Sequence, residues 1–103
     1  MTIGILGQSN PTASSNTTVY TVPSGVSSTF TISIVNTGTG AALVTLAVSA
    51  SGTPSASEYL EYQTSVPPNG VYERGGIVAQ TGKNVVVNCS TSNCAVSVYG
   101  FEQ

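Results

Sequence analysis

Apolar and polar residues alternate with a period of two over most of the chain, and turn residues interrupt this alternation about every 8–12 residues. No segment keeps a helical period over ten or more residues, so no long helix is expected. One short helical turn is expected at the sequence Ser55-Ala56-Ser57-Glu58, which resembles a capping box. The pattern predicts an all-β protein with the turn spacing of a sandwich or a barrel. The expected strands lie near residues 17–22, 28–36, 42–50, 58–64, 71–79, 84–89 and 94–101.

Two pairs of neighbouring strands can be aligned so that each pair has one wholly apolar face. A one-residue slip would expose that face, so the pattern predicts two hairpins with fixed register. The first would pair Phe30 with Val48, Ile32 with Leu46 and Ile34 with Val44; the second would pair Val85 with Val98, Val87 with Val96 and Cys89 with Cys94. Within the strand 71–79, the dipeptide Gly75-Gly76 predicts a β-bulge or a close backbone approach, with a break into two short strands as the alternative.

The first sixteen residues differ from the rest. Ile3, Ile5 and Leu6 form a short apolar group, and a linker-like polar stretch follows them. Two interpretations are open: an arm that adds a strand to a neighbouring subunit, or the first edge strand of the chain's own sheet. The expected organisation is therefore a short N-terminal arm or linker over 1–16 and one sandwich domain over 17–103.

The charge balance argues against two kinds of partner. Arg74 and Lys83 are the only cations, and the formal net charge is −2. Binding to phosphate backbones or anionic membranes needs clustered Lys and Arg, so neither nucleic acid nor a membrane surface is expected as a partner. No apolar run is long enough to span a bilayer, and the N-terminus lacks the basic region of a signal peptide. We expect the chain to be made in a cytoplasm.

The residues that usually perform catalysis are scarce. The chain has no His, and Lys83 lies beside Gly82 without a supporting nucleophile motif. Glu58 and Glu61 would point to opposite sides of a strand, which excludes them as a glycosidase pair. Two Cys without a second ligand pair do not complete a zinc site, and four Glu without Asp disfavour calcium. We therefore expect no enzyme, no cofactor and no metal.

Two groups of residues suggest structural or binding roles. Cys89 and Cys94 would face one another across the second predicted hairpin, either as a disulfide, which facing Cβ positions favour slightly, or as two buried thiols. Tyrosine is an efficient contact residue, so four tyrosines and one phenylalanine form a candidate interface to which Arg74 is added, with ordinary sheet-face or sandwich-rim packing as the alternative. Together with the N-terminal apolar group, the candidate interface comprises Ile3, Ile5, Leu6, Tyr59, Tyr62, Tyr72, Arg74, Tyr99 and Phe101.

A set of short segments spread over almost the whole chain carries a family resemblance. They are Leu6-Gly7-Gln8, Tyr20-Thr21-Val22-Pro23-Ser24-Gly25, Asn36-Thr37-Gly38, Ser51-Gly52, Val66-Pro67-Pro68-Asn69-Gly70, Glu73-Arg74-Gly75-Gly76-Ile77, Gly82-Lys83-Asn84-Val85-Val86-Val87 and Gly100-Phe101-Glu102. With these the sequence resembles small virion structural proteins of tailed phages, known particularly from cyanobacterial and marine hosts. The segments are mostly turns and strand starts, and the pair of cysteines is not a feature of that family.

The resemblance implies a β-sandwich, and with the strand pattern the expected fold is an antiparallel β-sandwich of about seven strands, Ig-like or jelly-roll-like. The resemblance further implies that the protein self-associates, with a trimer favoured, and docks on the lattice of the major capsid protein. The leading hypothesis is thus a capsid decoration (cement) protein on the virion surface that stabilises the head. The alternative is a tail, baseplate or fibre-associated β module involved in host attachment, with a host glycan as a conceivable contact. A cell-surface adhesin-like domain is a third hypothesis, disfavoured by the missing signal peptide.

Overall fold

The computed structural model describes residues 3–103 as eight strands and one short 3-10 helix. The all-β sandwich prediction is confirmed, and seven of the strands lie within two residues of the predicted bounds. The elements are β1 (Ile3–Ser9), β2 (Thr17–Thr21), β3 (Ser28–Asn36), β4 (Ala42–Ser49), η1 (Ala56–Glu58), β5 (Tyr59–Val66), β6 (Val71–Ala79), β7 (Asn84–Cys89) and β8 (Cys94–Glu102).

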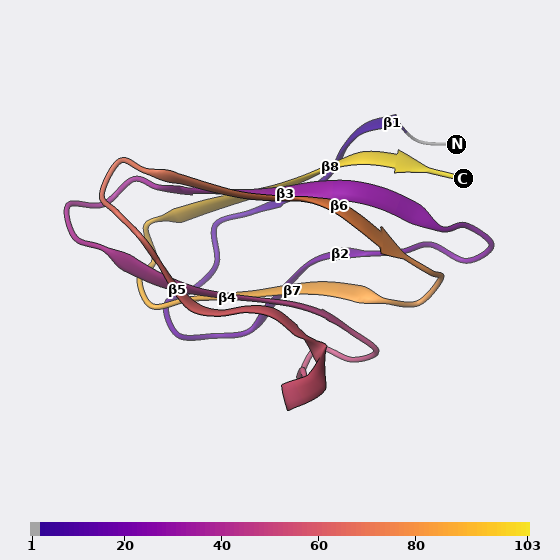
Figure 1. Ribbon diagram of the computed structural model, residues 1–103, viewed down its shortest axis with the longest axis horizontal. Helices are drawn as coiled ribbons and strands as arrows, with labels where there is room; N and C mark the ends of the chain where they lie inside the picture. The colour runs from indigo at the N-terminus through magenta and orange to yellow at the C-terminus, as the bar shows by residue number, and fades with distance from the viewer. Residues whose placement is uncertain (1–2) are drawn as a thin grey trace.

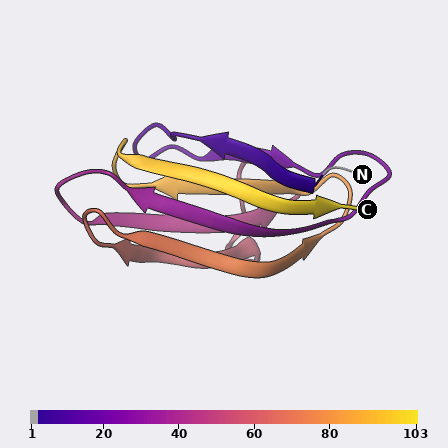
Figure 2. The ribbon, with the colours of Figure 1, turned by 90° about the horizontal axis from the view of Figure 1, so that it is seen from above.

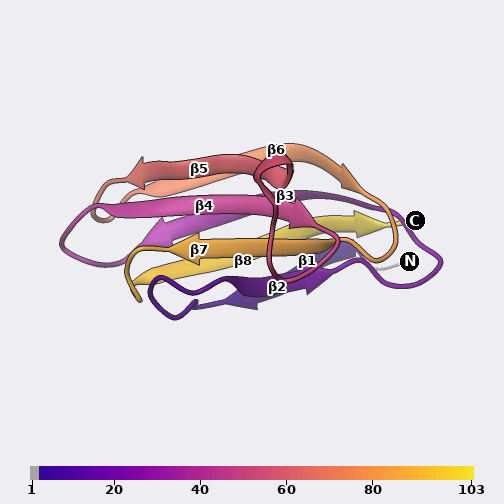
Figure 3. The same cartoon turned by 90° about the horizontal axis from the view of Figure 1, so that it is seen from below.

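The strands form two four-stranded antiparallel sheets that pack face to face (Figure 1). Sheet A has the order β1-β8-β3-β6 and is seen from above in Figure 2. Sheet B has the order β2-β7-β4-β5 and is seen from below in Figure 3. The first strand pairs with the last, and the chain passes between the sheets at every connection except β4–β5. This order is the eight-stranded jelly-roll topology, one of the two arrangements expected.

Both predicted hairpins are wrong, because their strands lie in opposite sheets. Ile34 of β3 pairs with Tyr72 and Val96 within sheet A, whereas Val44 of β4 pairs with Thr64 and Cys89 within sheet B. The alternation correctly identified the apolar face of each strand. A sandwich, however, buries two such faces equally well when the strands oppose one another across the core instead of pairing side by side.

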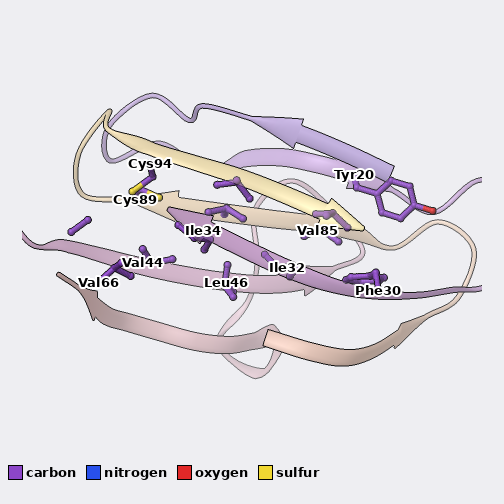
Figure 4. Close-up of a cluster of buried hydrophobic side chains, with 14 of the residues drawn as sticks. Tyr20, Phe30, Ile32, Ile34, Val44, Leu46, Val66, Val85, Cys89 and Cys94 are labelled. Carbon is purple, nitrogen blue, oxygen red and sulfur yellow. The ribbon is translucent and has the colours of Figure 1, made fainter. Parts of the chain in front are cut away.

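The same correction applies to the second pair. Cys89 ends β7 in sheet B, and Cys94 begins β8 in sheet A, so the segment 90–93 is an arch between the two sheets. Figure 4 shows the two side chains pointing toward one another at this end of the core. The two cysteines therefore face one another as predicted, but from opposite sheets instead of from neighbouring strands of one hairpin.

Residues 3–9 form β1, the edge strand of sheet A, and its antiparallel partner is β8. The structure thus matches the second interpretation of the N-terminal segment and differs from the expected division at residue 17. Gly7 permits this placement, because a Cβ added there would lie 2.4 Å from the carbonyl oxygen of Val19 on β2. Ile3–Ser9 therefore belongs to the sandwich itself.

Two local predictions are confirmed. Glu58 accepts a hydrogen bond from the backbone N–H of Ser55 at 2.8 Å, and the single turn η1 follows this cap. In β6, the register against β3 shifts between Phe30 and Ile32, opposite Gly75-Gly76, and Gly76 has a φ of 71°. The two glycines form a β-bulge within one continuous strand.

The core lies between the sheets and is built from branched aliphatic side chains with one aromatic pair. Phe30, Ile32 and Ile34 project from β3, and Val85 opposes them from β7 (Figure 4). Val87 of β7 belongs to the same buried cluster. The ring of Tyr20 meets that of Phe30 edge to face, with centroids 6.1 Å apart. Burial of these side chains supplies the main driving force for folding.

The β4–β5 connection folds back over the outer face of sheet B, as Figure 3 shows. Beneath it Ala47 and Val86 are almost completely buried although both belong to the outward side of the sheet. Gly52 of this connection reaches Thr18 on β2. One half of the outer face of sheet B is thereby covered, and the other half is open.

Candidate interaction surfaces

The nine residues of the predicted interface separate into three places and one buried position. Ile3, Ile5, Tyr99 and Phe101 gather on the outer face of sheet A. Tyr72 and Arg74 lie at the side of the sandwich, next to β5, and Tyr59 and Tyr62 lie on the outer face of sheet B. Leu6 is partly buried and packs against the core. The structure therefore does not bring the tyrosines together into one surface.

The group on sheet A forms a row that crosses all four strands. Ile3 pairs with Phe101, Phe101 pairs with Thr29, and Thr29 pairs with Val78. Ile5 and Tyr99 form the adjacent pair. The exposed fractions are 75% for Ile3, 56% for Ile5, 37% for Phe101 and 69% for Val78, so this end of sheet A presents apolar side chains to solvent. We call Ile3, Ile5, Val78, Tyr99 and Phe101 the apolar patch.

Tyr99 of the patch makes a polar contact with a neighbouring residue of sheet A. The Tyr99 hydroxyl donates a hydrogen bond to Glu73 Oε2 at 2.7 Å, and this bond raises the pKa of Tyr99. The contact satisfies the hydroxyl within the sheet, which leaves the ring available for apolar contact. Sequence reasoning missed Val78, because the bulge at Gly75-Gly76 reverses the alternation in β6 and hides which face that residue joins.

Arg74 and Tyr72 close the open side of the sandwich where β6 lies next to β5. Arg74 Nη1 contacts Glu61 Oε2 at 2.5 Å and donates to the carbonyl oxygen of Leu60 at 3.4 Å. The pKa of Glu61 is lowered by the Tyr72 hydroxyl first, then by the Thr64 hydroxyl and by Arg74. These side chains join sheet A to sheet B.

Tyr59 and Tyr62 line a polar cavity of about 250 Å³ on the open half of sheet B. Their rings lie 5.2 Å apart between centroids and are tilted by 58°. The remaining lining residues are Asn16, Thr45, Gln63 and Asn88. We call this feature the sheet B cavity. Nothing in the sequence indicated that Asn16, Gln63 and Asn88 would line the same cavity.

Cys89 and Cys94 are free thiols in the structure, and both are buried. Burial, together with a hydrogen bond to Cys94, raises the pKa of Cys89 to about 12. A thiol with so high a pKa carries almost no thiolate at neutral pH, and the thiolate is the reactive form. The pair fills space at the arch between the sheets.

Within residues 3–103, no group of three or more His, Cys, Asp or Glu side chains is arranged to hold a metal ion. The same residues contain no helix of the length and apolarity that a membrane crossing requires. Comparisons with protein-family models, with curated proteins and with solved structures give no match. Function must therefore be inferred from the surfaces themselves.

Proposed function

We propose that the protein is a structural component of a tailed-phage virion, a capsid decoration protein that self-associates and docks on the lattice of the major capsid protein. The apolar patch is the observation that carries the proposal. Contiguous apolar residues at a protein surface mark sites of association, and here they include the edge strand β1. An edge strand offers unpaired backbone groups to a neighbouring chain as well.

Three further properties support a packed assembly. The chain carries six charged side chains, so copies placed side by side repel one another weakly. The jelly-roll topology is one that viral capsid domains use repeatedly, although a fold alone does not define a function. The sequence resemblance to small phage virion proteins points in the same direction.

Copy number in purified virions tests the head location. A decoration protein is expected at an abundance near that of the major capsid protein, measured by quantitative mass spectrometry of intact particles. A handful of copies per virion would reject decoration and favour the alternative, a tail, baseplate or fibre-associated module.

Substitution of the patch tests the docking surface. The double variant Ile5→Ser and Phe101→Ser is expected to weaken self-association and binding to shells, measured by sedimentation velocity and by cosedimentation with undecorated heads. Val71→Ser is the matched control, because Val71 is 59% exposed on the same sheet but belongs to the opposite end. Equal binding by both variants would exclude the patch as the docking surface.

A further inference from the structure

The two sheets form opposite faces of the sandwich (Figures 1 and 3). The sheet B cavity and the apolar patch, which lies on sheet A, are therefore on opposite faces. A subunit that docks through sheet A would leave this cavity directed away from the shell. The residues that form the cavity do not depend on that orientation.

A bulge in β5 builds the cavity. Tyr62 and Gln63 both lie opposite Thr45, between the paired positions Thr64–Val44 and Glu61–Leu46. Gln63 has a φ of 51°, a conformation that side-chain-bearing residues seldom adopt. Its backbone N–H donates to Thr45 Oγ1 at 3.1 Å, which holds the bulge in place. Bulges redirect side chains, and this one brings both Tyr62 and Gln63 to the cavity.

Two asparagines complete the opposite wall. Asn88 pairs with Thr45 across β7 and β4, and its Nδ2 donates to Oδ1 of Asn16 at 3.0 Å. This bond fixes the two amide planes and leaves the Oδ1 atom of Asn88 as an acceptor. Within the described part of the chain, the side-chain amide of Gln63 and the hydroxyls of Tyr59 and Tyr62 have no hydrogen-bond partner. The cavity thus offers several donors and acceptors together with two aromatic rings.

The chemistry of the lining selects among ligand classes. None of the six lining residues is a cation or a carboxylate, so a phosphate or another strongly charged group would find no counter-charge. A purely apolar ligand would leave the amides unpaired, which is costly. The ligand that fits is neutral, carries many hydroxyls and has one apolar face. A sugar ring has this character, because its hydroxyls exchange hydrogen bonds with amides while its C–H face packs on an aromatic ring.

We propose that the sheet B cavity is a binding site for a neutral saccharide, with the Tyr62 ring against the sugar face and the amides of Gln63 and Asn88 bonded to its hydroxyls. A volume of about 250 Å³ is below the roughly 300–1,000 Å³ of pockets for drug-sized ligands, so the cavity holds one ring of a longer glycan. Because one ring makes few contacts, we expect single-site binding to be weak. Many copies on one particle would raise the avidity, a consequence that rests on the proposed function.

A nuclear magnetic resonance titration of the purified full-length chain tests the site. The probes are neutral trisaccharides of glucose, galactose, mannose and N-acetylglucosamine, at concentrations that saturate a site with a Kd of about 1 mM. At least one probe is expected to shift the amide signals of Thr45, Gln63 and Asn88. Absence of shifts with all four probes, or shifts confined to residues outside the cavity, would overturn the proposal.

Variants show whether the cavity side chains are responsible. Tyr62 is 65% exposed, so Tyr62→Ala should leave the fold intact while weakening saccharide binding at least tenfold. Leu43→Ala is the matched control, because Leu43 is also exposed on sheet B but does not line the cavity. Equal affinity of the Tyr62→Ala variant and the control would reject the site. The titration uses no shells, so its failure leaves decoration intact, and a failure of shell docking leaves the saccharide site intact.

Discussion

The hydroxyl of Tyr20 donates a hydrogen bond to Oε2 of Glu102 at 2.5 Å inside the sandwich, which joins the second strand to the last. The Ser28 hydroxyl lies 2.6 Å from the same Tyr20 oxygen. Glu102 is 8% exposed, and a carboxyl group so deeply buried requires hydrogen-bond donors. Next to it, the backbones of Ser27 and Gln103 exchange two hydrogen bonds of 2.9 and 2.8 Å. The C-terminal end of the chain is thereby fixed to the core.

Removing the Tyr20 hydroxyl is expected to destabilise the protein. Tyr20→Phe keeps the ring contact with Phe30 but leaves Glu102 with one donor fewer, which costs about 1–3 kcal/mol in the free energy of unfolding. Urea denaturation at neutral pH measures the change, with Tyr62→Phe as a surface control. An unchanged unfolding midpoint would show that the Tyr20–Glu102 bond contributes nothing net.

The same tyrosine predicts an alkaline limit to stability. Burial raises the pKa of Tyr20, and the hydrogen bond to Glu102 raises it further. A raised folded-state pKa means that the stabilisation is complete below the ordinary tyrosine value of about 10 and is lost as the pH rises through the folded-state pKa. Thermal unfolding measured between pH 8 and pH 12 should show a decline (roughly from pH 10 upward) that Tyr20→Phe reduces. An identical decline in both proteins would assign it to other groups.

Glu58 predicts a response to acid in the β4–β5 connection. The backbone N–H groups of Ser55 and Ala50 and the Ser49 hydroxyl donate to its carboxylate and lower its pKa to about 2. A lowered pKa means that the stabilisation is present above the ordinary value of 4.5 and is lost as the pH falls toward 2. The protection of the amide hydrogens of residues 50–58, corrected for the intrinsic pH dependence of exchange, is expected to fall in that window. Glu58→Gln should give fast exchange already at neutral pH, and slow exchange in that variant would contradict the role.

Asn36 is expected to be among the least replaceable polar residues. It is fully buried, and its Nδ2 donates to the carbonyl oxygens of Gly40 and Val66 at 2.8 and 3.0 Å while its Oδ1 accepts from Gly38 N–H at 3.0 Å. Asn36→Ala removes the side-chain partner of these backbone groups and should lower the free energy of unfolding by about 2–3 kcal/mol. Chemical denaturation measures the loss. Thr37, the neighbouring residue, is exposed and provides a control. Thr37→Ala should lower the free energy of unfolding clearly less than Asn36→Ala does.

Local features of the chain were predictable because they depend on nearby residues. Alternation located seven strands, Ser55 with Glu58 indicated the helical turn, and Gly75-Gly76 indicated the bulge. Strand partners were not predictable, because alternation states which face is buried and not which strand lies beside it. Ile34 and Val44 face the same core from different sheets, and a predicted hairpin cannot be distinguished from such an arch by pattern alone.

For the candidate surfaces too, single residues could be predicted from the sequence, whereas their assembly in space could not. Ile3, Ile5 and Phe101 were recognisable as apolar residues, but their assembly into one patch depends on β1 pairing with β8, the two most distant strands in the sequence. The sheet B cavity was even harder to predict from the sequence. It combines Asn16 and Asn88, which are 72 residues apart, with Gln63, whose unusual backbone conformation has no sequence signal.

The order of strands also bears on how the chain acquires its structure. Only β4 and β5 are neighbours both in the sequence and in a sheet, and β8 lies between β1 and β3. Until β8 has been synthesised, β1 has no partner and β3 lacks one of its two. The complete sandwich can therefore form only after β8 has left the ribosome. It should also be slow for a domain of this size, because nearly every strand pairing closes a long loop.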